Sequence, residues 1–298
     1  MDELWLNNGK LIEESEWIKD LTKLKSTVEF QDKLTAKEEL KKTIITAIKN
    51  RCPKSKFGIF FSGGVDSSLI SALGQKLNQD FICYTVGFQD EKTTEPEDII
   101  EAKKVAKQLG FKLKYKIYNL TETEKIIEKT TRLLRTVKKD DVVNVGVGSV
   151  IVAAVELAQK DKMNYFFSGL GSEEIFAGYD RHSKAEDINQ ECWKGLFNMW
   201  SRDLMRDFTL SQEFKFTLKT PFLDSKLINL AMKLPGNWKL NKTEKKIILR
   251  EIAQEYLGEY AWRKKTAAQY GSCFDKAIQK LAKKQGFKLK KEYLDNIK

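Results

Sequence analysis

Hydrophobic and polar positions follow two different periods along the first part of the chain. Short apolar or alternating segments predict β-strands at 57–61, 81–86, 112–117 and 165–167. Apolar residues at helical spacing predict helices over 36–49, 67–77, 98–109, 123–134 and 149–159. Strands that alternate with helices in this way predict a parallel sheet with helices on both faces, which is a doubly wound α/β fold.

The pattern changes after about residue 187, where strand-like segments give way to helical spacing. Helices are predicted over 193–204, 225–234 and 243–256. We therefore expect three parts. They are an N-terminal lead and helix over 1–50, an α/β domain over 51–187, and a mainly helical part over 188–298.

The composition is that of a globular protein, because 41% of the 298 residues are hydrophobic and 32% are charged. No apolar run approaches the length of a membrane span, so we expect a cytoplasmic protein without membrane contact. The single histidine, His182, excludes a histidine-rich metal site. The cysteines are too far apart for a zinc or iron–sulfur motif, and we expect them to be reduced: Cys52, Cys83, Cys192 and Cys273.

The chain is basic, with 53 Lys and Arg against 42 Asp and Glu and a formal net charge of +11. A basic tail near the C-terminus holds Lys276, Lys280, Lys283, Lys284, Lys288, Lys290 and Lys291. Such a run is typical of a solvated helix face, and it also fits an RNA-binding surface. Few aromatic residues accompany these lysines, which argues against a stacking platform for single strands.

A glycine-rich block follows the first predicted strand of the sheet. It consists of Ser62-Gly63-Gly64-Val65-Asp66-Ser67-Ser68 and leads into a predicted helix. Glycines let the backbone approach a ligand closely, and the N–H groups at a helix start favour an anion. The block therefore predicts a phosphate-binding loop, with an ordinary strand-to-helix turn as the alternative. It is not a Walker loop, because no G-x-x-x-x-G-K-[ST] occurs in the chain.

A second block joins small residues to two acids after the strand at 165–167. Its sequence from Ser168 to Tyr179 is S-G-L-G-S-E-E-I-F-A-G-Y. The carboxylates of Glu173 and Glu174 are ligands of the kind that magnesium prefers. The alternative is a helix start at which acids are favoured by the helix dipole.

These blocks carry a resemblance to a known family. The first resembles the pyrophosphate-binding loop (PP-loop) of the ATP pyrophosphatases, whose fold is the adenine nucleotide α-hydrolase type. The second resembles the S-G-[DE]-G-S-D-E-x-F-x-G-Y signature of asparagine synthetases. Two further segments, P-F-L-D at 221–224 and K-x-x-L-R at 246–250, match motifs of the same enzymes. The resemblance covers about residues 50 to 272, and the chain is identified as a member of the asparagine synthetase-like branch.

The resemblance implies an enzyme that uses ATP and Mg²⁺ to form an acyl-adenylate, which ammonia then attacks. AMP and pyrophosphate are released, and for aspartate the product would be asparagine. By position, it implies that Asp66 and Glu173 hold the metal and that Lys246 steadies the α-phosphate and the departing pyrophosphate. The ATP-binding set that it implies is Ser62, Gly63, Gly64, Asp66, Ser67, Ser68, Val86, Gly87, Ser168, Gly169 and Lys246. Charge type and motif position suggest five residues for the substrate: Arg181, Arg206, Lys219, Arg250 and Asp224.

Three departures from the family pattern bear on the substrate. Leu170 replaces the acid between the two glycines, and Thr217 and Lys219 replace the glutamate and arginine of the motif before P-F-L-D. None of the first fifty residues is a cysteine, so we expect a synthetase domain without a glutaminase domain. Nitrogen would then come as free ammonia or from a separate glutaminase subunit. The alternatives are a PP-loop enzyme that adenylates tRNA or another macromolecule, and a non-catalytic nucleotide-binding subunit.

Overall fold

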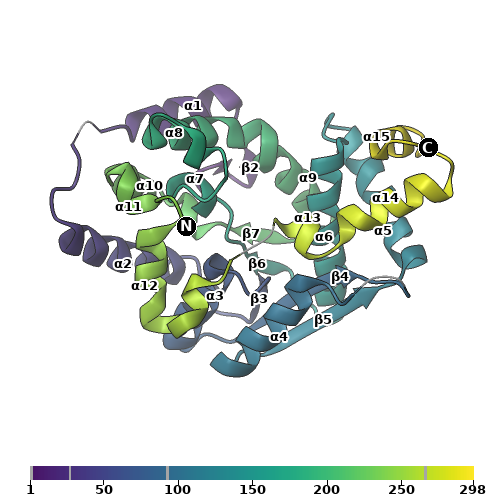
Figure 1. The fold of residues 1–298 in the computed structure, drawn as a ribbon, viewed down its shortest axis with the longest axis horizontal. Helices are drawn as coiled ribbons and strands as arrows, with labels where there is room; N and C mark the ends of the chain where they lie inside the picture. Colours follow the sequence, from purple (N-terminus) through teal and green to yellow (C-terminus); the bar gives the residue numbers. More distant parts are fainter. Residues whose placement is uncertain (1–2, 27, 92–93, 265–266) are drawn as a thin grey trace.

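A parallel β-sheet forms the centre of the protein in a computed structural model that describes residues 3–26, 28–91, 94–264 and 267–298. Its five strands lie in the order β5-β4-β3-β6-β7 (Figure 1). Their bounds are β3 Phe57–Phe60, β4 Phe81–Phe88, β5 Leu113–Tyr118, β6 Tyr165–Phe167 and β7 Thr217–Lys219. The parallel α/β fold predicted from the pattern is confirmed.

The strand order has a switch point between β3 and β6. From β3 the chain steps outward through α3 (Val65–Lys76) to β4 and through α4 (Glu97–Leu109) to β5. It then returns through α5 (Leu120–Arg135) and α6 (Val142–Gln159) to β6 on the other side of β3. Right-handed crossovers in opposite directions place these helix pairs on opposite faces of the sheet. Ligands of such folds bind outside the carboxyl ends of the strands at the switch point.

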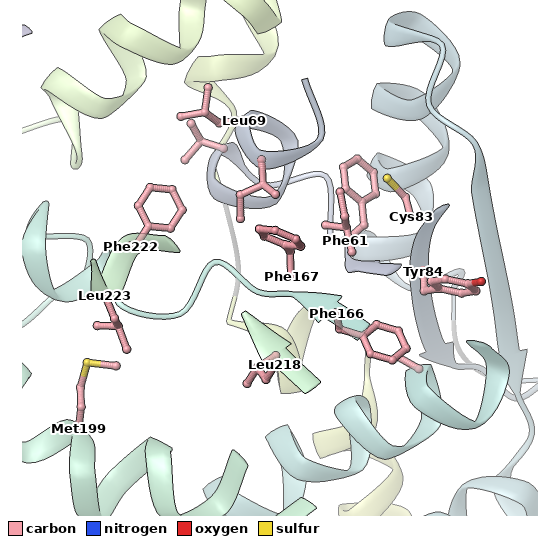
Figure 2. Close-up of a cluster of buried hydrophobic side chains, with 14 of the residues drawn as sticks. Phe61, Leu69, Cys83, Tyr84, Phe166, Phe167, Met199, Leu218, Phe222 and Leu223 are labelled. Atoms are coloured by element: carbon pink, nitrogen blue, oxygen red, sulfur yellow. The ribbon is translucent and has the colours of Figure 1, made fainter. Parts of the chain in front are cut away.

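Aromatic side chains fill both faces of the sheet next to that point. Consecutive strand residues point to opposite sides. Phe166 and Phe167 accordingly point to different sides of β6 (Figure 2). Phe166 stacks on Phe60 with ring centroids 4.8 Å apart, whereas Phe167 contacts Phe57 at 4.9 Å. Gly58 provides the space for this packing, since a Cβ there would lie 2.5 Å from the Phe166 ring. The strands that carry the two sequence blocks are therefore held rigidly side by side.

The sheet extends past residue 187, where the sequence shows no strand. β7 is only three residues long and pairs with β6 in register, with Phe167 opposite Lys219. A segment so short has no period of its own, and tertiary pairing makes it a strand. The division expected at 187 therefore separates β7 from the sheet to which it belongs.

The remaining helices pack around this sheet, and several begin earlier or later than predicted. Their bounds are α1 Glu14–Lys23, α2 Lys33–Lys49, α7 Ser172–Ile175, α8 Ile188–Met199, α9 Met205–Glu213, α10 Ser225–Met232, α11 Gly236–Lys239, α12 Ile247–Leu257, α13 Ala268–Gly271, α14 Phe274–Lys284 and α15 Lys290–Asp295. A π-helical turn at Trp200–Leu204 joins α8 to α9. The polar lead at the N-terminus also holds structure, namely the hairpin of β1 (Leu6–Asn7) and β2 (Lys10–Leu11) and helix α1.

Helix α6 begins seven positions before the helix predicted from Ser149. Asp141 caps it by accepting hydrogen bonds from the N–H groups of Val143 and Asn144. Gly146 and Gly148 fall in its first turns, where a Cβ would lie about 3 Å from side chains of neighbouring segments. At its full length, α6 is the one described helix that is long and apolar enough to cross a membrane, contrary to our expectation, but most of it is buried inside this fold.

The basic tail forms α14 and α15, which lie beside α5 and α6 (Figure 1). Phe274, Ile278 and Leu281 of α14 are fully buried. Three lysines of the basic tail pair with acids of this chain: Lys280 with Asp90, Lys290 with Asp275 and Lys291 with Asp295. The tail is thus an amphipathic cover of the core with a solvated basic face.

Candidate functional site

The glycine-rich block lies where β3 ends and α3 begins, at the switch point of the sheet. Gly63 has a φ of +68°, which L side chains rarely adopt, and a Cβ there would lie 3.0 Å from the backbone of Glu101. Gly64 is the N-cap of α3, so Asp66 falls in the first helical turn. The N–H groups of that turn have no partner within the helix, and such groups favour an anion, as the sequence predicts for this loop.

Lys246 reaches this loop from the distant start of α12. Its Nζ donates to both carboxylate oxygens of Asp66, at 2.9 and 2.8 Å, and to the Ser172 hydroxyl at 2.9 Å. It also lies 2.8 Å from Oε1 of Glu173. The structure thus brings together the three residues that the resemblance names as catalytic, Lys246, Asp66 and Glu173.

The lysine of this cluster remains charged inside the protein. Lys246 is 3% exposed and Asp66 is 3% exposed. Burial alone would lower the pKa of Lys246, but the carboxylates of Asp66 and Glu173 outweigh it and raise that pKa. The backbone of Lys246 is left-handed, with a φ of +56°, which directs the side chain inward ahead of α12.

Small residues of the second block let Glu173 approach the lysine. A Cβ on Gly178 would lie 1.7 Å from Oε2 of Glu173 and 2.4 Å from Cε of Lys246. A Cβ on Gly169 would lie 2.7 Å from that of Asp66. Glycine is therefore needed at these positions for packing of the site itself, independently of any bound ligand.

The other residues of the predicted nucleotide site line the same end of the sheet. Ser168 follows β6, and its hydroxyl accepts from the N–H of Leu170 at 3.2 Å. Val86 and Gly87 lie near the carboxyl end of β4, and Gly87 faces Pro96 and Ile99 at the start of α4. Ser67 and Ser68 are buried in the first turns of α3. Their roles toward a nucleotide stay predictions.

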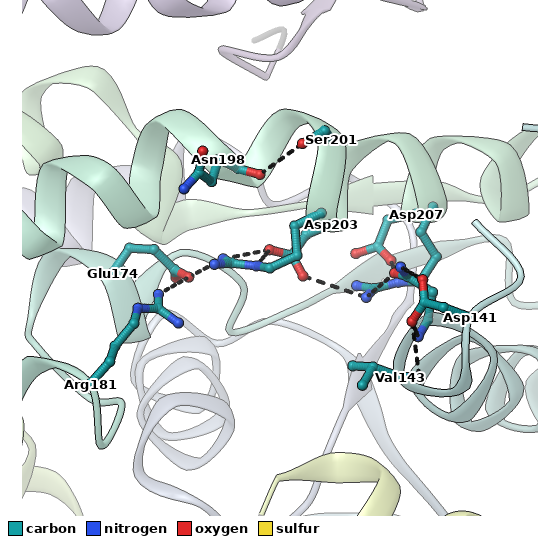
Figure 3. A network of polar contacts seen from close by, with 11 residues as sticks. Asp141, Val143, Glu174, Arg181, Asn198, Ser201, Asp203 and Asp207 are labelled. Carbon is teal, nitrogen blue, oxygen red and sulfur yellow. Dashed lines mark hydrogen bonds and ion pairs between the residues drawn. The ribbon is translucent and has the colours of Figure 1, made fainter. Parts of the chain in front are cut away.

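Two of the suggested substrate residues belong to an ionic network beside the site (Figure 3). Arg206 donates to Asp207 at 2.7 Å and lies 3.4 Å from Asp203. Arg181 lies 3.2 Å from Glu191 and stacks 4.1 Å over the ring of Tyr179. The network joins the second block to the π-helical turn, which also supplies Arg202 as a partner of Glu174.

The remaining three substrate candidates contact groups of this chain. Asp224 caps α10 and accepts from Arg51 at 2.9 Å. Lys219 lies 3.5 Å from Glu3. The guanidinium of Arg250 donates to the carbonyl oxygens of Lys245 at 2.8 Å, Ala261 at 2.6 Å and Arg263 at 2.9 Å. These contacts hold segments together, and the structure gives Arg250 in particular a backbone-binding role.

Three residues at or behind the site were not predicted from the sequence. Ser172 hydrogen-bonds Lys246, and it stands inside the second block, so the motif itself could have indicated it. Arg263 donates to the carbonyl oxygen of Ser62 at 3.0 Å and pairs with Glu101 at 3.3 Å. The fully buried Glu3 pairs with Arg51 at 3.1 Å. Glu3 belongs to no recognisable motif, whereas Arg263 lies within the stretch that the resemblance covers.

Glu174, next to Glu173, is expected to make stability depend on pH. Burial, together with the carboxylate of Asp203, raises its pKa from 4.5 to about 7, although Arg202 opposes this shift. The carboxyl group of Glu174 therefore binds its proton more tightly in the folded protein than in the unfolded chain. The stability that the protonated carboxyl contributes is lost as pH rises from about 4.5 to 7.

We accordingly expect Glu174→Gln to gain stability relative to wild type across that pH interval. Urea unfolding of both proteins at several pH values measures the difference, and Glu186→Gln on the exposed surface is the matched control. A difference between Glu174→Gln and wild type that stays constant with pH would contradict the assignment.

The carboxylates of Asp66 and Glu173 fit a magnesium ion that arrives with phosphate. Each has an oxygen 2.8 Å from the same ammonium nitrogen, so the two oxygens are at most twice that distance apart. Among the described residues there is no group of three or more His, Cys, Asp and Glu side chains that could hold a metal. Magnesium often takes only one or two carboxylates and completes its shell with water and substrate phosphates.

Fold and site together define a doubly wound α/β protein with a glycine-rich loop and a lysine–carboxylate cluster at its switch point. The asparagine synthase family model matches residues 39–193 and 182–296. The chain therefore belongs to the asparagine synthase family, and this membership implies the use of ATP.

Curated relatives of similar sequence are named asparagine synthetases. A putative glutamine-hydrolyzing asparagine synthetase of Methanocaldococcus jannaschii is 34% identical over 307 residues, which cover 88% of this chain and 55% of the relative. The glutamine-hydrolyzing asparagine synthetase of Gallus gallus is 26% identical and is covered over 46% of its length, again with 88% of this chain. The chain thus spans about half the length of these relatives.

Solved structures are similar at lower identity. The NH3-dependent NAD synthetase of Campylobacter jejuni is 15% identical, with 80% of this chain and 99% of that chain covered and a TM-score of 0.33. The NMN synthetase of Francisella tularensis is 12% identical, with 85% and 97% covered and a TM-score of 0.33. TM-scores this low carry no argument about the fold, which is defined by the strand order of this protein.

Proposed function

We propose that this protein is an ATP-dependent amide ligase that forms an acyl-adenylate, with aspartate and ammonia as its substrates. The observation that supports it best is the convergence of Lys246, Asp66 and Glu173 beside the glycine-rich loop. A buried cation next to an anion-binding helix start is suited to phosphate chemistry, because it stabilises the charge that develops when pyrophosphate leaves.

In the proposed reaction a substrate carboxylate oxygen attacks the α-phosphorus of ATP. The bond to the bridging oxygen of the β-phosphate breaks, and pyrophosphate leaves with the bond electrons. Ammonia then attacks the acyl carbon, loses a proton and displaces AMP, which leaves an amide. Lys246 neutralises the pyrophosphate, and the first turn of α3 holds its oxygens.

Asp66 and Glu173 would hold Mg²⁺ in this site, and bound magnesium would neutralise phosphate charge. The nitrogen would come as free ammonia or from a separate glutaminase subunit. The acid of the family signature is replaced by Leu170, whose side chain packs against the core, so no carboxylate at this position would contact the acyl-adenylate or the ammonia. The packed basic tail gives no specific support to an RNA acceptor.

The test is release of pyrophosphate and AMP from ATP by the purified protein with magnesium and aspartate, with and without ammonium. We expect asparagine, identified by mass spectrometry, in amounts equal to AMP and only when ammonium is present. Asp66→Asn is the matched control and should release neither product. Absence of AMP with aspartate, with other small carboxylates and with tRNA would overturn the proposal in favour of a non-catalytic nucleotide-binding subunit.

A further inference from the structure

The ammonium group of Lys246 occupies a shell of oxygen atoms like that of a metal ion. Its neighbours are two oxygens of Asp66, one of Glu173 and the hydroxyl of Ser172, all between 2.8 and 2.9 Å away. An ammonium has only three N–H donors, so these four oxygens share them. Both carboxylates that fit magnesium are thus already engaged by one resident cation.

From this arrangement we infer that Lys246 holds the metal position while no nucleotide is bound, and that it moves to the phosphates when magnesium arrives with ATP. The inference rests on the proposed function, which assigns Asp66 and Glu173 to magnesium. It predicts an order of binding, because the metal alone has to compete with the lysine for the same two carboxylates.

Charge explains why the metal and the nucleotide would have to arrive together. The two carboxylates and the ammonium carry a net charge of about −1 at a site where both Lys246 and Asp66 are almost fully buried. A divalent ion added next to the lysine would meet a like charge at close range in a medium of low dielectric constant. The negative phosphates of ATP remove this conflict, since they attract both the ion and the lysine.

The structure also permits such a movement. Lys246 has a flexible four-carbon stem, and its backbone precedes the first residue of α12, so the side chain can shift without displacing the helix. The glycine-rich loop starts α3 with Asp66 in its first turn, and a phosphate bound there would lie next to the present position of the ammonium. A short displacement along the site would exchange carboxylates for phosphate.

Manganese(II) binding in the absence of ATP tests this inference directly. Free Mn²⁺ is followed by electron paramagnetic resonance during titration of wild type, Lys246→Met and Lys245→Met, the last as matched control because its ammonium pairs with the exposed Asp180. We expect weak binding by wild type and Lys245→Met, and binding tighter by about tenfold or more in Lys246→Met. The double variant Asp66→Asn with Lys246→Met should lose this gain.

A second measurement uses wild type alone, in case Lys246→Met does not fold. Addition of α,β-methylene ATP, whose α–β linkage cannot be cleaved, should tighten Mn²⁺ binding by wild type by about tenfold or more. Mn²⁺ binding by wild type that is as tight without nucleotide as with it, or a folded Lys246→Met that gains nothing, would overturn the inference.

These outcomes are separable from those of the proposed function. If the protein makes asparagine but binds Mn²⁺ equally well with and without nucleotide, the proposed function is supported and the exchange of Lys246 for the metal is overturned. If the protein releases no AMP but Lys246→Met binds Mn²⁺ more tightly than wild type, the exchange of Lys246 for the metal is supported and the proposed function is overturned.

Discussion

Lys246→Met is expected to lower the rate of pyrophosphate release by about 100-fold to 1,000-fold, the range seen when one preorganised charge-stabilising group is removed from an active site. The physical reason is the position of the ammonium, 2.8 Å from carboxylates of the loop and of the second block. Methionine has a similar length but no charge. Initial rates at saturating ATP and aspartate measure the effect.

The neighbouring lysine provides the control for this prediction. Lys245→Met removes an ammonium one position away, but that ammonium pairs at the surface with Asp180. We expect its rate to stay close to that of wild type. Circular dichroism checks that both variants are folded, which matters because loss of Lys246 leaves the buried Asp66 without this partner. Equal rates for the two variants would refute a catalytic role of Lys246.

Gly63→Ala is expected to weaken ATP binding by about tenfold or more, for two reasons that add at the same residue. Alanine at a φ of +68° costs roughly 1 kcal/mol or more in backbone energy. In addition, its Cβ would lie 3.0 Å from the backbone of Glu101, so the loop has to shift away from α4. A shifted loop no longer aims its N–H groups at phosphate. Calorimetric titration with an ATP analogue measures the loss.

Gly286 separates these two contributions. It has a φ of +84° and no neighbouring atom within 4 Å of a Cβ, so Gly286→Ala carries the backbone cost without the clash. We expect Gly286→Ala to lose stability in thermal unfolding but to bind ATP as wild type does. ATP binding by Gly63→Ala as tight as that by Gly286→Ala would show that the close approach to Glu101 does not position the loop.

The strands at 57–61, 81–86 and 165–167 could be predicted because each is a buried apolar run bounded by turn-forming residues. The start of α6 was predicted too late, since valines and glycines at its N-terminus hide the helical period. β7 was not predicted at all, because three residues carry no period and only pairing with β6 makes them a strand.

The sequence predicted the positions of some site residues better than the contacts of others. Asp66 and Glu173 lie at the helix starts that follow β3 and β6, so a motif and a strand end were enough to place them at one edge of the sheet. Arg206 and Arg250 were suggested for the substrate mainly from their charge, and in this structure they contact Asp207 and backbone carbonyls respectively. Charge type indicates that a side chain has a partner, but it does not indicate which one.

By itself, the sequence determined the repeated strand–loop–helix units and the glycines and acids at their junctions. These features depend on residues that are neighbours in the chain, and their periods can be read locally. Tertiary structure alone decided that Lys246 contacts Asp66 across 180 positions and that Glu3 reaches Thr220 across 217. Such contacts depend on how the helices pack on the sheet. This packing is the result of many weak interactions between residues far apart in the chain, and a local sequence pattern does not show them.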